Sequence, residues 1–222
     1  MEQIDRGNLK EALATLSVFY NASELTTDQR LDMLDLLDAL AREVVYSRRH
    51  FLDTAYVVAP SDSLDALSKK YKVPGEIIAK INAIDPRTSL PNGALLKVVP
   101  GPFRAEIDLT RGELTIFLGD LYASRYPVSF GSDPAPQAGP FQVVDKRKDH
   151  SYYGAGIQTI APNDPRNPYG GFWIDLGGEM CIHGSPLGEA GDGKLGCISL
   201  APRDADDVYS MLDRGSQVTI RK

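Results

Sequence analysis

Apolar residues in the first fifty positions recur at steps of three and four, the period of a helix with one buried face. The recurring positions are Leu9, Ala12, Leu13, Leu16 and Tyr20 in a first stripe, and Leu34, Leu37, Ala41 and Val44 in a second. Between the stripes, Thr26 and Gln29 have the spacing of a capping box at a helix N-terminus. The pattern predicts a helical hairpin over residues 1–52.

Two further helix starts lie within residues 54–100. Ser63 precedes the apolar residues Leu64 and Leu67 and has the hydroxyl that caps a helix N-terminus. Pro74 is predicted in the first turn of the following helix, where the missing N–H of proline is tolerated. Pro100-Gly101-Pro102 then ends the segment and marks the clearest domain boundary.

From residue 103 the hydrophobic period changes to two. Ala105 and Ile107 alternate with polar residues, and Arg111-Gly112 and Gly119-Asp120 mark turns. Short strands at this spacing predict a β-rich sandwich or barrel over residues 103–222. Near the end, Pro202 opens a helix that stops before Gly215, and residues 217–220 form a last strand. The whole chain is therefore assigned to the α+β class.

Composition and charge restrict the possible partners. A chain of 222 residues has room for one or two modest domains with their own cores. Its net charge of −6 provides no basic surface for nucleic acid. The sequence has no apolar run of about 18 residues, so we expect no membrane span. The first residues lack the basic start and apolar stretch of a signal peptide.

The chain has only two cysteines and three histidines. Both cysteines and one of the histidines lie in one glycine-rich stretch, residues 181–197. If residues 180–184 form a strand, Cys181 and His183 point to the same face. Cys197 follows fourteen residues after His183. A neighbouring imidazole is the usual means of converting a thiol into a nucleophilic thiolate near neutral pH. We therefore expect Cys197 to act as nucleophile and His183 as general base and acid.

Four segments carry a resemblance to a known family. They are IHGSP at residues 182–186, GCISL at 196–200, PQAGPFQV at 136–143 and NPYGGFWI at 167–174. In this order they resemble the L,D-transpeptidase (YkuD-type) catalytic domain, over roughly residues 103–222. The resemblance implies formation of 3→3 crosslinks between peptidoglycan stem peptides through a cysteine thioester. It also implies that no metal or organic cofactor is needed and that carbapenem β-lactams are covalent inhibitors.

The resemblance also implies roles for individual positions. The carbonyl of Gly184 would orient His183, and backbone N–H groups around Leu195 and Gly196 would form an oxyanion hole. Side chains expected at the substrate are Tyr153, Trp173, Lys194 and Ser199. Residues 152 and 153 both offer flat aromatic faces beside the cleft.

The chain departs from the family pattern at three positions. Lys194, Leu195 and Ser199 stand where the family usually has serine, histidine and arginine. Without the arginine, the pKa of the thiol should be less depressed, and a substrate carboxylate loses a bidentate partner. Lys194, Arg147 or Arg203 would have to replace that cation.

Residues 54–100 resemble a LysM module, a βααβ unit that binds glycan strands, although Ser61 stands where these modules usually have glycine. Tyr56, Asp62 and Asn82 are its candidate glycan-binding residues.

Residues 1–52 loosely resemble a tetratricopeptide hairpin, but a single repeat cannot bury its own face. We expect this hairpin to be a structural spacer or the end of a longer helical array. Because the implied substrate is the cell wall, we expect an extracytoplasmic protein whose signal or anchor precedes this sequence.

Several alternatives remain open on sequence grounds. The same Cys197–His183 pair could serve an L,D-carboxypeptidase with water as acceptor, or the altered motif could belong to a non-catalytic glycan-binding protein. Cys181 either fills space beneath His183 or forms a reversible disulfide with Cys197.

A zinc site lacks an evident fourth ligand, so we predict no metal. Residues 191–196 fit G-x-G-x-x-G but lack the preceding strand and following helix of a dinucleotide site. His50 and His150 lie in polar, basic stretches and are expected to be solvated.

Overall fold

The structure, a computed structural model, describes residues 3, 6–153, 159–162, 164–185 and 195–222. Its chain divides into two compact units. The first comprises Met1–Phe103 together with Ile116–Ser124, and the second comprises Arg104–Thr115 together with Arg125–Lys222. The first unit thus ends close to the predicted boundary at residues 100–102 but also takes in the distal part of a later hairpin.

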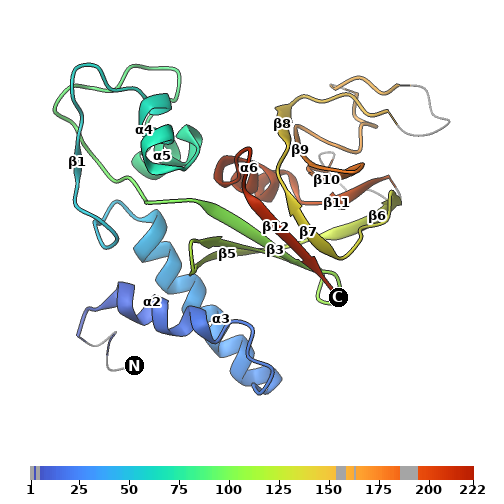
Figure 1. Cartoon of the computed structure of the whole chain (residues 1–222), viewed down its shortest axis with the longest axis horizontal. Coiled ribbons are helices and arrows are strands. Elements are labelled where there is room, and N and C mark those ends of the chain that lie inside the picture. Colours follow the sequence, from blue (N-terminus) through green and yellow to red (C-terminus); the bar gives the residue numbers. More distant parts are fainter. Residues whose placement is uncertain (1–2, 4–5, 154–158, 163, 186–194) are drawn as a thin grey trace. The chain divides into compact units, whose positions relative to one another are not determined.

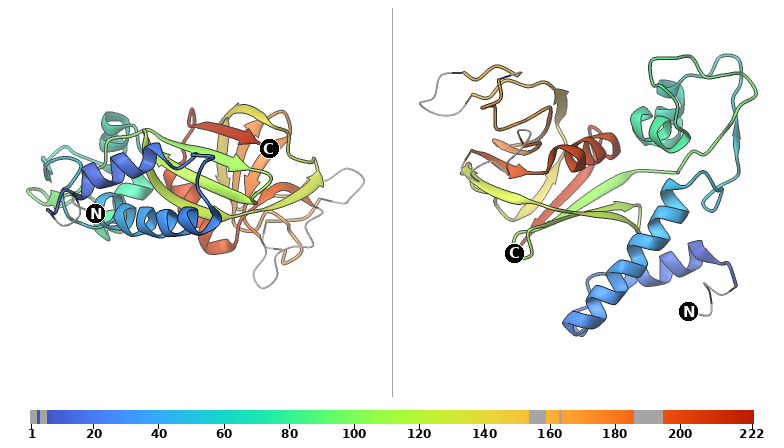
Figure 2. Two further views of the ribbon diagram at one scale, coloured as in Figure 1. Left: turned by 90° about the horizontal axis from the view of Figure 1, so that it is seen from below. Right: turned by 180° about the vertical axis from the view of Figure 1, so that it is seen from behind.

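Two helices, α2 (Leu9–Val18) and α3 (Thr27–Ala41), contact each other in the first unit (Figure 2), and a π-helical turn, η1 (Arg42–Tyr46), continues α3. The predicted capping box is confirmed at the start of α3. The hydroxyl of Thr26 accepts from the backbone N–H of Gln29 at 3.3 Å, and the Gln29 side chain accepts from the Thr26 N–H at 3.0 Å. Leu34 and Leu37 of the second stripe are buried, as their spacing predicts.

The tip of the hairpin formed by β4 (Glu113–Leu118) and β5 (Leu121–Pro127) belongs to the first unit because its aromatic residues pack on these helices. The ring of Tyr20 lies 5.3 Å from Phe117 and 5.5 Å from Tyr122. The hydroxyl of Ser17 accepts from the backbone N–H of Tyr122 at 2.9 Å, and the Tyr122 hydroxyl donates to Asp38. No sequence pattern in residues 116–124 indicated this association.

A small βααβ module follows within the first unit. It consists of β1 (Tyr56–Val57), α4 (Leu64–Tyr71), α5 (Gly75–Asn82) and β2 (Leu95–Leu96), with β1 and β2 antiparallel. Ser63 caps α4 as predicted, since its hydroxyl accepts from the Ala66 N–H at 3.1 Å. Pro74 is the N-cap residue of α5, so it lies just before the first helical turn and not within it as predicted.

A five-stranded sheet begins where alternation was predicted (Figure 1). Its strands, in spatial order, are β5 (Leu121–Pro127), β4 (Glu113–Leu118), β3 (Phe103–Asp108), β12 (Gln217–Arg221) and β7 (Gly139–Gln142). The first and last strands of this C-terminal region, β3 and β12, run parallel, with Ile107 opposite Ile220. Both predicted turns occur, before β4 and before β5.

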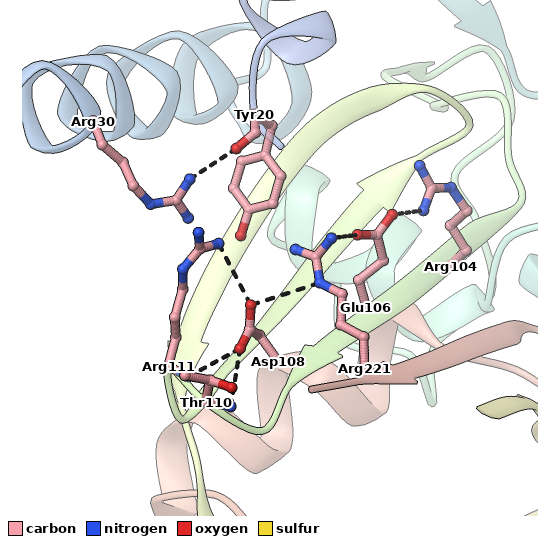
Figure 3. Close-up of polar contacts among 8 residues, drawn as sticks. All are labelled: Tyr20, Arg30, Arg104, Glu106, Asp108, Thr110, Arg111 and Arg221. Atoms are coloured by element: carbon pink, nitrogen blue, oxygen red, sulfur yellow. Dashed lines mark hydrogen bonds and ion pairs between the residues drawn. The ribbon is translucent and has the colours of Figure 1, made fainter. Parts of the chain in front are cut away.

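The polar residues of β3 form an ion-pair network with their neighbours (Figure 3). Glu106 pairs with Arg104 at 2.6 Å and with Arg221 of β12 at 3.4 Å. Asp108 pairs with Arg221 at 3.6 Å and with Arg111 at 3.4 Å. Because Phe103, Ala105 and Ile107 are buried between these positions, β3 separates an apolar face from a charged one.

A second five-stranded sheet contains the predicted chemistry. Its strands, in spatial order, are β6 (Ser129–Asp133), β11 (Gly196–Ser199), β10 (Met180–His183), β9 (Phe172–Gly177) and β8 (Asp145–Lys148). Helix α6 (Pro202–Met211) starts at Pro202 as predicted and ends before the predicted stop at Gly215. Tyr209 of α6 packs on Phe172 with ring centroids 5.2 Å apart, so α6 covers the face of the sheet that carries Phe172.

In the part of the chain that the structure describes, no helix is both long enough and apolar enough to cross a membrane.

Candidate active site

Strand pairing collects the candidate residues on one face of the second sheet. Strands β10 and β11 are parallel, and their register places His183 opposite Ser199 and Ile182 opposite Ile198. On the other side of β10, His183 lies opposite Trp173 of β9. Because side chains alternate along β10, Cys181 shares the face of His183, Ser199 and Trp173, and the thiol of Cys197 meets the thiol of Cys181 at 3.5 Å. This is the face opposite Phe172 and α6.

His183 is buried, with 3% of its surface exposed. Its Nδ1 lies 2.6 Å from the carbonyl oxygen of Gly184, which only accepts, so Nδ1 carries the proton. Nε2 is then unprotonated, and it is buried without a hydrogen-bond partner among the residues that the structure describes. Burial lowers the pKa of His183 from 6.5 to about 4. The imidazole is therefore neutral, with a basic nitrogen that no group in the described part of the chain binds.

Gly196 explains how the imidazole comes so close to the residue before Cys197. A Cβ at position 196 would lie 2.2 Å from His183 Nε2, a distance that no side chain tolerates. The backbone φ of Gly196 is also +77°, in the left-handed region that favours glycine. Glycine is thus required here on two grounds, and its absence of a side chain lets Nε2 approach strand β11.

Cys197 is also buried, with 1% of its surface exposed. Its thiol donates to the carbonyl oxygen of Glu179 at 3.2 Å and accepts from the thiol of Cys181 at 3.5 Å. Neither Cys181 nor Cys197 forms a disulfide. Glu179 lies in the tight turn between β9 and β10 and has a φ of +68°, uncommon for a residue other than glycine. Sequence reasoning missed Glu179, because a contribution from a backbone carbonyl leaves no mark on residue type.

Aromatic rings line the site beside His183. Tyr169 lies 5.2 Å from the imidazole of His183, and Trp173 lies 6.4 Å from Tyr169. Trp173 Nε1 is a second buried nitrogen without a hydrogen-bond partner in the described part of the chain. Asn167 supports Tyr169, since its side chain accepts from the Tyr169 N–H at 2.9 Å and donates to the His150 carbonyl at 2.9 Å. The NPYGGFWI segment was noted in the sequence, but no role was predicted for Asn167 or Tyr169.

The prediction that His150 is solvated is wrong. Its ring packs on Trp173 at a tilt, with centroids 4.2 Å apart, and stacks on Tyr169 at 5.9 Å, so the side chain is partly buried. Burial, followed by the charge of Arg147, lowers the pKa of His150. The polar neighbours of His150 predicted exposure, whereas His150, two residues after β8, packs in an aromatic cluster with Tyr169 and Trp173.

The two tyrosines predicted beside the cleft differ in exposure. Tyr153 is 67% exposed, whereas Tyr152 is only 1% exposed. Tyr152 packs edge-on against Tyr169 with ring centroids 5.2 Å apart. The prediction that Tyr152 offers a face to substrate is therefore wrong, because its ring forms part of the core.

The positions at which the chain departs from the expected pattern are only partly described. Leu195 precedes β11, and the hydroxyl of Ser199 donates to the Ser129 carbonyl at 3.4 Å. Lys194 and most of the G-x-G-x-x-G segment lie outside the described residues. Of the other cations considered, Arg147 is held by Asp145 at 2.9 Å, and Arg203 lies on α6, on the opposite face of the sheet.

The residues predicted to bind glycan all have partners within the βααβ module. The hydroxyl of Tyr56 donates to Asp62 at 2.6 Å, and Asp62 also accepts from the Ala59 N–H. The Asn82 amide donates to the carbonyls of Ile78 and Lys97 and accepts from the Lys97 N–H. A cavity of about 200 Å³ opens beside Asn82. Tyr56 and Asp62 are not among its lining residues.

Within the described residues, no group of three or more histidine, cysteine or acidic side chains could hold a metal ion.

Comparisons with known proteins bear on the C-terminal region. The family model of the L,D-transpeptidase catalytic domain (YkuD) matches residues 102–220. The curated protein "Putative L,D-transpeptidase YkuD" of Bacillus subtilis (strain 168) is 22% identical over 179 residues. That alignment covers 75% of this chain and 98% of the relative.

Solved structures show a more distant likeness. An L,D-transpeptidase from Mycobacterium smegmatis is 20% identical, with 59% of this chain and 64% of that chain covered and a TM-score of 0.44. L,D-transpeptidase 3 from Mycobacterium tuberculosis, in complex with a faropenem-derived adduct, is 14% identical. Its coverage is 59% of this chain and 65% of that chain, with a TM-score of 0.45. The match thus spans just under two thirds of each mycobacterial chain.

The match of the family model extends over more than half of the 222 residues and includes all the strands that carry Trp173, His183 and Cys197. The chain belongs to the L,D-transpeptidase catalytic domain family.

Proposed function

We propose that this protein is a peptidoglycan L,D-transpeptidase that forms 3→3 crosslinks through a thioester on Cys197. One observation carries the proposal. The buried His183 Nε2 has no hydrogen-bond partner among the described residues and lies against Gly196, the residue that precedes Cys197 in the chain. A buried polar atom without a partner costs stability, and such groups are concentrated at functional sites.

In the first half-reaction, His183 Nε2 takes the thiol proton of Cys197 as the sulfur attacks the carbonyl of the third stem residue. The Gly184 carbonyl holds the imidazole through Nδ1 and stabilises the imidazolium that forms. The carbon–nitrogen bond to the terminal D-alanine then breaks. The leaving amine takes the proton from His183, which leaves a thioester on Cys197 and a neutral imidazole.

In the second half-reaction, an amine of a neighbouring stem attacks the thioester. His183 accepts a proton from this amine, and the Cys197 sulfur leaves and is reprotonated. Backbone N–H groups at Leu195, Gly196 and Cys197 are the proposed donors to the oxyanion in both halves. Loss of one such donor typically raises the barrier by about 3 kcal/mol.

The substrate contacts proposed for this chain differ from those implied by the family pattern. Ser199 replaces the usual arginine and bonds to Ser129, so it leaves no cation at this place for a substrate carboxylate. Trp173 and the exposed Tyr153 are proposed to contact the stem peptide through their rings. Tyr169, which packs on His183, joins them in this role. Lys194 remains a proposed cation for the substrate.

The βααβ module is proposed to be a LysM module that holds the enzyme on glycan strands. Its element order and the cavity beside Asn82 support this role. Binding there would raise the local concentration of stem peptides at the catalytic domain. Because the substrate is cell wall, we propose an extracytoplasmic location.

Covalent inhibition tests the nucleophile directly. The M. tuberculosis enzyme described above is reported with a faropenem-derived adduct, and another relative is reported as an avibactam carbamoyl enzyme. For this chain, the reduced wild-type protein and Cys197→Ala are incubated with a carbapenem, and their intact masses are compared. We expect one adduct on the wild type and none on Cys197→Ala. Absence of an adduct on folded, reduced wild type would contradict a nucleophilic Cys197 and favour a glycan-binding protein.

Product analysis tests the acceptor. The protein is incubated with isolated tetrapeptide muropeptides, and the products are separated and weighed. Dimers joined between two third residues are expected. Trimmed tripeptide monomers without dimers would instead identify an L,D-carboxypeptidase that uses the same Cys197–His183 pair.

A further inference from the structure

Two buried thiols face each other across β10 and β11. The sulfur atoms of Cys181 and Cys197 are 3.5 Å apart, and neither side chain is more than 3% exposed. We propose that they form a redox pair, in which a hydroperoxide oxidises Cys197 and Cys181 captures it as a reversible disulfide that blocks the nucleophile. The inference rests on the proposed function only in taking Cys197 as the reactive thiol.

Strand register makes the disulfide feasible without backbone rearrangement. Ile182 lies opposite Ile198 in the parallel ladder; Cys181 and Cys197 directly precede these paired residues, and their sulfur atoms meet at 3.5 Å. Neighbouring strands are about 4.8 Å apart, and disulfides join Cα atoms about 4.4–6.8 Å apart. Rotation of the two side chains toward each other therefore suffices to form the bond.

The two thiols have unequal roles because they form a directed chain of hydrogen bonds. Cys181 donates to Cys197, and Cys197 donates to the Glu179 carbonyl. The contact with Cys197, followed by burial, raises the pKa of Cys181 well above its ordinary value. Cys181 thus keeps its proton when Cys197 ionises. Because the thiolate is the form that peroxides attack, Cys197 is oxidised first and Cys181 resolves the product.

The reaction balances in two steps. The Cys197 sulfur attacks one peroxide oxygen, the O–O bond breaks, and water leaves, so that Cys197 becomes a sulfenic acid while the peroxide is reduced. The Cys181 sulfur then attacks the Cys197 sulfur, and an S–S bond forms as the S–O bond breaks. The hydroxide leaves with the Cys181 proton as water. Two electrons have passed from the thiol pair to the peroxide, and a dithiol reductant returns them.

Cys181 has a simpler reading as a small residue that fills space beneath His183. The two readings differ in what happens to an oxidised Cys197. Without a resolving thiol, a sulfenic acid proceeds with more peroxide to sulfinic acid, which ordinary thiols do not reduce. The burial of Cys197 does not distinguish these two roles of Cys181. Hydrogen peroxide is far smaller than the stem peptide that must reach Cys197 in the proposed function. Cys181 therefore matters most under oxidation.

The test compares the full-length wild type with Cys181→Ser and Cys181→Ala, each shown to be folded by circular dichroism. Each is treated with hydrogen peroxide, denatured, labelled with N-ethylmaleimide and weighed, before and after dithiothreitol. The wild type is expected to lose two hydrogens and both labels, and to regain both labels on reduction. In both variants Cys197 is expected to gain two oxygens and to stay unlabelled after reduction. Serine keeps nearly the volume of cysteine, so it controls for packing.

Carbapenem adduct formation after reduction separates this inference from the proposed function. Recovery of adduct in the wild type but not in the Cys181 variants, each relative to its own untreated sample, supports the redox pair. If wild type also forms sulfinic acid and fails to recover, the redox pair is wrong, although untreated protein still forms the adduct. If the untreated protein forms no adduct but still gives the reducible disulfide, the proposed function fails and the redox pair stands.

Discussion

Lys97 in the βααβ module and His183 in β10 have the same exposed fraction, 3%, but their hydrogen bonding differs. Lys97 Nζ donates to the carbonyls of Val44 and Ser47 at 2.7 Å each, and its own backbone is bound by the Asn82 amide. Nδ1 of His183 is bound by the Gly184 carbonyl, and Nε2 has no partner among the described residues. Burial lowers the pKa of both, Lys97 to about 8 and His183 to about 4.

The difference separates a structural polar group from a chemical one. A buried polar group that is fully hydrogen-bonded contributes to the stability of its unit, whereas a buried open one costs stability. In the first unit every polar atom of Lys97 and Asn82 discussed above is used within the fold. In the second unit Nε2 has no partner among the described residues and lies against Gly196, the residue before Cys197. Four predictions test or sharpen this contrast, in order of expected size.

Replacing the open base should have the largest effect. We expect His183→Gln to slow acylation of Cys197 by a carbapenem by roughly 10²–10⁴-fold, because general base catalysis is lost. Stopped-flow or timed intact-mass measurements follow the rate. Lys97→Met is the matched control and should acylate at the wild-type rate. If acylation slowed equally in His183→Gln and Lys97→Met, the slowing would not be due to loss of a general base at His183.

The pH dependence of stability should identify His183 as a buried neutral imidazole. Between pH 6.5 and about 4, the unfolded chain binds a proton that native His183 does not. The free energy of unfolding should therefore fall as the pH falls through this window, by about 3 kcal/mol from this residue. Urea titrations of wild type and His183→Gln across the window isolate its share. If the free energy of unfolding changed with pH in the same way in both proteins, His183 would not be held neutral by the fold.

Displacing the imidazole should affect activity more than stability. In Gly196→Ala, the new methyl group would overlap His183 Nε2, which must move away from Cys197. We expect acylation to slow by roughly 10²-fold, with a stability loss of about 1–2 kcal/mol from the positive φ. Gly119→Ala is a matched control, since it also has a positive φ but no atom within 4 Å of the added carbon. Similar acylation rates in the two variants would argue against contact between Gly196 and His183 in solution.

Replacing the hydrogen-bonded Lys97 should have the smallest effect, and it should change the free energy of unfolding but not the acylation rate. Lys97→Met leaves the carbonyls of Val44 and Ser47 without their donor, so we expect unfolding to become easier by about 1–3 kcal/mol. Thermal and chemical denaturation of the full chain measure this change. An unchanged stability would mean that water replaces the ammonium group and that the lysine is not a structural anchor.

Local patterns were read correctly where the physical cause was local. The Thr26–Gln29 capping box and the Ser63 cap depend on residues within one helical turn, and both formed as predicted. Alternation in residues 103–107 predicted β3 because burial on one face imposes a period of two. Failures came where distant segments meet. His150 and Tyr152 were misjudged because the aromatic cluster around Tyr169 and Trp173 is assembled by the sheet.

The amino-acid sequence by itself determined the helix starts, the strand periodicity and the cysteine and histidine available for chemistry, because these depend on residue type and short spacing. Only the tertiary structure decided that Cys181 faces Cys197, that Glu179 supplies a carbonyl to the thiol and that His183 Nε2 has no partner among the described residues. These features arise from the parallel pairing of β10 with β11 and from a tight turn before β10. Strand register and backbone direction are collective properties of the sheet, and a single residue's type does not specify them.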